Sequence, residues 1–190
     1  MSHGIKGHTE EDGLSTAMRL LLHYIGDIHQ PLHATSRVDS SYPAGDRGGN
    51  EFPLPSVDGA KNLHAVWDSV AYEFTNDYKL PFSESDWKKI GEQAETLVAK
   101  HDISESVFDE LDFTKWAQES FEISESFVYK DITEGQALPE DYIEKAQEYA
   151  EKQIVIGGHR MANLLKTMSL KERVNEFQGE FDSFYPLFLQ

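Results

Sequence analysis

Apolar residues recur at intervals of three and four over most of the chain, the spacing typical of amphipathic helices. In the first such segment the apolar positions are Leu14, Met18, Leu21, Leu22, Ile25 and Ile28. Because a proline inside a helix breaks it, Pro31 limits this segment, and the pattern predicts a helix over 13–29. Residues 34–60 are rich in Ser, Asp, Pro and Gly instead, and predict a long loop with a short extended piece at 50–54.

The same spacing predicts four more helices, over 62–75, 86–100, 114–129 and 140–168. The core-facing stripe of the first should be Leu63, Val66, Val70 and Phe74, and that of the second Trp87, Ile90, Ala94 and Leu97. Ser83 is the expected cap of the helix at 86–100. The fold class is therefore all-α. Residues 174–190 are aromatic and apolar; they would fold back on the domain or dock on a partner chain, and we favour the first because apolar surface is generally buried.

Two histidine–aspartate pairs, His23 with Asp27 and His64 with Asp68, share a four-residue spacing, and His33 lies between them. A four-residue step on a helix returns to the same face one turn later, so each pair can direct two ligands at one metal. Imidazole and carboxylate together suit Zn²⁺, and three protein ligands with an open fourth position are typical of catalytic zinc.

Either pair alone would be interpreted as a hydrogen-bonded pair on a helix surface. Two pairs together with His33 and the glycine-rich block at 45–50 favour a metal site. The chain has no cysteine, which excludes a thiolate zinc ribbon, an iron–sulfur cluster and disulfides. His29 lies about 200° around the helix from Asp27, so we place it outside the ligand set, behind the ligands or at the surface. Trp67 faces away from the ligands and should belong to the core.

These blocks resemble the S1/P1 nucleases, a zinc-dependent family whose fold is shared with bacterial phospholipases C. Residues 23–33 are similar to the family's H-x-x-G-D-x-H-Q-P-L-H, residues 46–50 to its D-x-G-G-N and residues 62–68 to its N-L-H-x-V-W-D. Residues 157–165 resemble its closing helix more weakly. The order and spacing of all four blocks agree with the family.

The resemblance implies an all-α, phospholipase C/P1 nuclease-like helical domain over 1–169, followed by an aromatic-rich tail over 170–190. It implies that His33, His64 and Asp68 bind one Zn²⁺, and that His23 and Asp27 contribute to two more. Asp27 would bridge the two and is assigned as catalytic. Asn50 is expected to face the substrate phosphate. The implied activity is metal-assisted hydrolysis of phosphodiesters in single-stranded nucleic acid, or removal of phosphate from 3′-nucleotides.

One departure from the family concerns the remaining ligands, because family members supply an N-terminal Trp, two histidines and an aspartate upstream of the first block. Residues 1–22 contain no match to them. We therefore expect one complete zinc site, and up to three if a companion polypeptide supplies the missing ligands. The alternatives are a catalytically degenerate structural or interaction subunit, and a truncated chain. No signal peptide is seen. The resemblance implies a secreted or lysosomal/vacuolar location.

Composition describes a single-domain protein with 39% hydrophobic and 12% aromatic residues, enough for one core. No apolar run is long enough for a membrane span. The 34 acidic residues outnumber the 17 basic ones, which gives a net charge of −17. Because most nucleic-acid binders present a basic stripe, metal charge would have to offset repulsion of the substrate locally. Phospholipase activity is a weaker alternative, since the glycine and asparagine block favours nucleotides.

Overall fold

The computed structural model describes residues 9–74, 78 and 80–168, and these are mostly helical. The elements in chain order are α1 (Glu10–Ile28), the 3₁₀ turn η1 (Pro31–His33), β1 (Pro53–Val57), β2 (Ala60–Asn62), α2 (Leu63–Asp68), α3 (Glu84–Lys100), α4 (Glu105–Phe108), α5 (Phe113–Ile123), the π-helical turn η2 (Ser124–Val128) and α6 (Glu140–Thr167). The all-α prediction is confirmed, with one short antiparallel hairpin, β1–β2, in the predicted loop.

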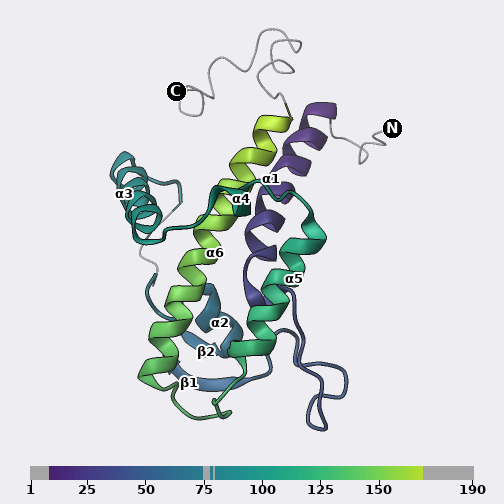
Figure 1. Ribbon diagram of the computed structural model, residues 1–190, viewed down its shortest axis with the longest axis vertical. Coiled ribbons are helices and arrows are strands. Elements are labelled where there is room, and N and C mark those ends of the chain that lie inside the picture. Colours follow the sequence, from purple (N-terminus) through teal and green to yellow (C-terminus); the bar gives the residue numbers. More distant parts are fainter. Residues whose placement is uncertain (1–8, 75–77, 79, 169–190) are drawn as a thin grey trace.

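The long helices α1, α5 and α6 run alongside one another, and α2 and the hairpin close one end of this group (Figure 1). Helix α3 stands to one side and contacts the group through α6 (Figure 1). The turn η1 follows α1 directly and contacts α2 as well as α5 and η2. It therefore lies where the segments carrying the candidate ligands meet.

Helix boundaries follow the local chemistry of the sequence. Thr9 caps α1 in a capping box with Asp12, in which each side chain bonds the backbone N–H of the other residue. Ser83 and Asp86 form the same motif at the start of α3, which confirms the predicted cap. Because Pro31 cannot donate a backbone hydrogen bond, it ends the first helical pattern and begins η1.

The core lies between α2, the hairpin, η2 and the first half of α6. Its members include Phe52, Leu63, Val66, Trp67, Val128, Tyr142 and Ala146. Trp67 is 2% exposed, as predicted, and its indole N–H donates to Tyr142 Oη at 3.1 Å. The Tyr142 hydroxyl in turn donates to the Val128 carbonyl at 2.7 Å, so these buried polar groups are satisfied.

Two predicted helices differ from the structure. The one expected over 62–75 ends at Asp68, because Val70, Ala71 and Tyr72 take left-handed backbone conformations with φ of 53°, 48° and 71°. This turn still buries Val70 and Ala71 in the core. In α3 the predicted stripe is mostly outside the core, since Leu97 is the one buried residue of that helix. The apolar tail expected at 174–190 lies outside the described residues.

Candidate metal centre

The turn η1 folds the chain back at the end of α1 so that His33 returns to the level of Asp27. The Asp27 carboxylate Oδ2 lies 3.2 Å from His23 Nε2, one turn earlier on α1, and 3.6 Å from His33 Nδ1. One carboxylate oxygen therefore stands between two imidazoles. The His23 side chain is 66% exposed, whereas His33 is 28% exposed and faces α2 with its other ring nitrogen.

Helix α2 brings His64 and Asp68 to the opposite face of His33. Asp68 Oδ1 lies 3.4 Å from His33 Nε2, and Asp68 Oδ2 lies 3.4 Å from His64 Nε2. The His33 and His64 rings are 4.8 Å apart between centroids. One ligand atom from each of these three residues lies within 4.8 Å of the other two. All five residues singled out from the sequence are thus joined in one row from His23 to His64.

The donor set and its spacing suit Zn²⁺. Two ligands at about 2.1 Å from a tetrahedral zinc lie roughly 3.4 Å from each other. The Asp68 carboxylate has this separation from both imidazoles, through Oδ1 to His33 Nε2 and through Oδ2 to His64 Nε2. The three side chains are 18–49% exposed, so the group can be reached from solvent.

The glycine-rich block fixes which nitrogen of His64 faces Asp68. His64 Nδ1 lies 2.8 Å from the Gly48 carbonyl oxygen, which can accept a hydrogen bond but cannot donate one. Nδ1 must therefore carry the proton, and the Nε2 lone pair is left for a metal. A backbone carbonyl behind a ligating histidine is the usual way in which proteins set its tautomer.

Comparison with known proteins identifies the family of the chain. The model of the S1/P1 nuclease family matches residues 3–169. The chain belongs to the S1/P1 nuclease family. It is 31% identical over 160 residues to Endonuclease 1 of Arabidopsis thaliana, covering 80% of this chain and 49% of the relative. It is 29% identical over 166 residues to Endonuclease 3 of the same plant (84% and 53%), and 27% identical over 161 residues to Nuclease P1 of Penicillium citrinum (77% and 55%).

The chain spans about half the length of these curated relatives. Family membership confirms the resemblance drawn from the motifs and the all-α, S1/P1 nuclease-like fold. Within residues 9–74 and 80–168, no helix combines the length and apolarity needed to cross a membrane.

Gln30 is a further residue of this candidate metal centre, and no role was assigned to it from the sequence. Its amide Nε2 donates to Asp68 Oδ1 at 2.8 Å, and its Oε1 accepts from the Leu32 N–H at 2.5 Å. Gln30 is thereby the N-cap of η1 and also holds the Asp68 carboxylate. The signal in the sequence was a polar residue directly before a proline that starts a helical turn.

The neighbours of His33 and Asp68 shift both pKa values. The hydrogen bond to Asp68 raises the pKa of His33 above its usual value, against the effect of burial, and the Asp27 and Asp68 charges act in the same direction. Burial alone would raise the pKa of Asp68, but hydrogen bonds from His33 and Gln30 outweigh it and lower that pKa. The lowered pKa favours the ionised Asp68 carboxylate, and any metal bound at His33 would have to compete with a proton there.

Asn50 and Asp46 have local roles in the loop. The Asn50 side chain is exposed, and its amide donates to the Arg47 carbonyl at 2.9 Å, so its contact with a substrate phosphate stays a prediction. Asp46 is fully buried and accepts from the Arg37 N–H at 2.9 Å, which closes the loop between them. His29 lies outside the ligand set as expected; it is buried, at 3% exposed, rather than at the surface.

Proposed function

We propose that this chain is the zinc-binding portion of an S1/P1-type nuclease that hydrolyses phosphodiesters of single-stranded nucleic acid, 3′-nucleotides or both. The observation that supports it best is the convergence of His33, His64 and Asp68, whose ligand atoms lie within 4.8 Å of one another. The relatives' names as endonucleases and nucleases support the same reaction class.

In this proposal each residue of the group has a separate task. His33, His64 and Asp68 hold one Zn²⁺, with His64 supplying Nε2 because the Gly48 carbonyl engages its Nδ1. His23 and Asp27 would contribute to the two other zincs, with Asp27 as the carboxylate shared between them; Asp27 Oδ2 lies 3.2 Å from His23 Nε2. Bound zinc would polarise a phosphoryl oxygen and lower the pKa of water at the site. Asn50 binds the substrate phosphate from the loop side.

We further propose that a separate chain supplies the remaining ligands for the zincs at His23 and Asp27. His23 supports this proposal, because its side chain is 66% exposed and contacts Asp27 alone among the five residues. On its own the chain should therefore bind one zinc tightly.

The test is zinc analysis of the purified chain, followed by assays on single-stranded DNA and a 3′-nucleotide with and without a chelator. We expect about one tightly bound zinc per chain. His33→Ala removes one of three ligands and should abolish zinc binding and any zinc-dependent hydrolysis. His159→Ala is the control, because that histidine stacks on Phe108 instead and its loss should leave zinc binding intact.

A chain that never takes up zinc, and in which His33→Ala changes neither assembly nor stability, would overturn the proposal. It would favour the structural or interaction subunit instead. Hydrolysis that appears only after a polypeptide carrying the N-terminal ligands is added would support the division between two chains. Full activity with one zinc per chain would exclude that division while leaving the nuclease itself intact.

A further inference from the structure

The segment from Ile28 to Pro31 connects the two parts of the candidate site, because Asp27 precedes it and His33 follows it. It lies where α1 ends, so the Ile28 and His29 carbonyls lack the partners that a continuing helix would provide, whereas the Gln30 and Pro31 carbonyls accept backbone N–H groups within η1. The distance between Asp27 Oδ2 and His33 Nδ1, 3.6 Å, depends on the path of this short connection. Whatever fixes its backbone also fixes these two ligands.

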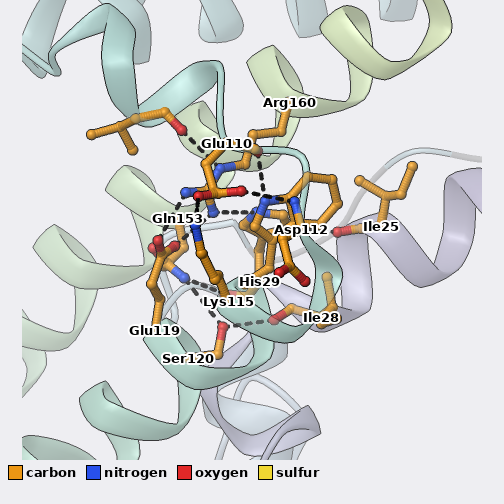
Figure 2. A network of polar contacts seen from close by, with 12 residues as sticks. Ile25, Ile28, His29, Glu110, Asp112, Lys115, Glu119, Ser120, Gln153 and Arg160 are labelled. Carbon is orange, nitrogen blue, oxygen red and sulfur yellow. Dashed lines mark hydrogen bonds and ion pairs between the residues drawn. The ribbon is translucent and has the colours of Figure 1, made fainter. Parts of the chain in front are cut away.

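Side chains from three other elements, α5, η2 and α6, bind carbonyl oxygens of this segment. The Ser120 hydroxyl of α5 donates to Ile28 O at 2.6 Å, and the Ser124 hydroxyl, at the start of η2, donates to Pro31 O at 2.9 Å. Between them, Gln153 Nε2 of α6 donates to His29 O at 3.0 Å. Ser120, Ser124 and Gln153 are 0%, 1% and 6% exposed, so water cannot replace these bonds easily. Figure 2 shows Ser120 and Gln153 beside Ile28 and His29.

The His29 ring anchors the same segment from the side. Its Nδ1 lies 2.7 Å from the Ile25 carbonyl and its Nε2 lies 3.2 Å from Arg160 Nη1. Since Arg160 can only donate, Nε2 accepts and Nδ1 carries the proton, which describes a neutral imidazole. Burial, together with the Arg160 charge, also lowers the pKa of His29.

Helix α6 approaches the His29 ring closely because residue 157 is a glycine. A Cβ atom there would lie 3.2 Å from His29 Cγ, tighter than most real contacts. Arg160 is fully buried and binds both oxygens of Glu119, at 2.6 Å and 3.0 Å, which fixes α6 against α5 (Figure 2). The ring is thus enclosed by two helices that are themselves joined by an ion pair.

We infer that Ser120, Ser124 and Gln153 are positioning residues for the metal centre, which they reach through the backbone of residues 28–31. This inference rests on the proposed zinc site and adds residues that contact none of its ligands. Partners of metal ligands commonly change metal affinity about 10- to 100-fold when they are lost. Because these three act one step further away, we expect about a tenfold loss for each.

The experiment compares Gln153→Met with Gln147→Met in the intact chain. Both glutamines lie on α6 and donate to a backbone carbonyl, Gln153 to His29 and Gln147 to Ala71 at 3.0 Å. Methionine preserves the length of the side chain and removes the donor. Both variants lose a bond of 3.0 Å to a carbonyl, and Gln153→Met also loses the longer bond to Ser120 Oγ at 3.3 Å. Zinc affinity is measured by competition with a chromophoric chelator. Exchange of the His33 amide is measured by NMR without metal.

A second pair of variants provides an independent comparison if a variant of the first pair does not fold. Ser124→Ala removes the hydroxyl that bonds Pro31 O, whereas Ser126→Ala removes one that bonds Glu122 O on the same stretch of chain. We expect Gln153→Met and Ser124→Ala to bind zinc about tenfold more weakly than their controls. The His33 amide should also exchange faster in both. A purely structural role would lower stability without separating the zinc affinities of the paired variants.

Equal zinc affinities and equal His33 exchange within each pair would overturn the inference, even if the wild-type chain binds zinc. If the wild-type chain binds no zinc, the proposed function fails, and the exchange comparison alone decides whether the three residues position this segment. The two failures are therefore distinguishable.

Discussion

At the scale of single residues, His64 depends on a glycine sixteen positions earlier. Gly48 has φ of +64°, and a Cβ atom there would lie 2.3 Å from the Leu32 carbonyl oxygen. The carbonyl of Gly48 itself accepts a hydrogen bond from His64 Nδ1. A side chain at position 48 must therefore move either the turn before His33 or the acceptor behind His64, and both changes affect the ligand group.

We predict that Gly48→Ala lowers the free energy of unfolding by about 3 kcal/mol, because left-handed strain and a backbone clash add together. It should also weaken zinc binding about tenfold. Gly59→Ala is the matched control, since Gly59 has φ of +90° but open space around its Cβ position. Backbone strain alone should lower the free energy of unfolding of Gly59→Ala by about 1 kcal/mol and leave its zinc affinity unchanged. Urea denaturation and chelator competition measure both effects; equal results for the two variants would contradict this account.

The sequence indicated the five side chains but not their supports. Histidine and aspartate at helical spacing are visible as residue types, and the structure brings all five together. The Gly48 carbonyl contacts the His64 ring, and the Gln153 side-chain amide contacts the His29 carbonyl. Each contact involves a backbone carbonyl and joins residues that are distant in sequence. Every residue has a backbone carbonyl, so a sequence pattern cannot show which carbonyl accepts a hydrogen bond from a ligand side chain. That information comes only with the packing of α5, α6 and the loop.

At the scale of elements, hydrophobic periodicity predicts where the helices lie better than it predicts their lengths or their packing. Helix α6 was expected over 140–168 and is observed over Glu140–Thr167. The prediction that the apolar stripe of α3 faces the core is mostly wrong. Periodicity shows that a helix has an apolar side but not how much of that side other elements cover. Trp87 remains 54% exposed, since α3 meets α6 through its last turns, where Lys100 and the following His101 contact Glu151.

The Glu151 contact should make the attachment of α3 dependent on pH. Burial would raise the pKa of Glu151, but hydrogen bonds from Lys100 and His101, both at 2.7 Å, lower it below its usual value. A carboxyl group whose pKa is lowered by folding stabilises the protein above its unfolded pKa. This contribution is lost as the pH falls through the folded pKa.

We predict that Glu151→Gln lowers the free energy of unfolding by about 2 kcal/mol at pH 7, because two charge-assisted bonds are lost. The difference from wild type should shrink as the pH falls below about 4.5, where the unfolded carboxyl is protonated. Glu148→Gln, which removes an exposed partner of Lys152, is the control and should have little effect. Urea denaturation at several pH values measures this. A difference that stays constant with pH would show that the Glu151 charge is not involved.

At the scale of the whole molecule, the net charge of −17 opposes the proposed substrate. Single-stranded nucleic acid is a polyanion, and a protein that neutralises its phosphates with basic residues binds it more weakly as salt increases. Here attraction would come from metal charge at one small site, while the rest of the surface repels. Salt screens charges separated by more than about 10 Å at 0.1 M, so it should weaken the repulsion more than contacts at the metal.

A longer substrate meets more of this repulsive surface than a mononucleotide does. We therefore predict that kcat/KM for a single-stranded oligonucleotide, divided by kcat/KM for a 3′-nucleotide, rises about two- to fivefold between 10 mM and 150 mM salt at saturating zinc. The mononucleotide is the internal control, because effects of salt on zinc binding or on stability change both rates alike. If the ratio falls steeply with salt, basic residues bind the strand in the usual way, and metal charge is not what overcomes the acidity of this chain.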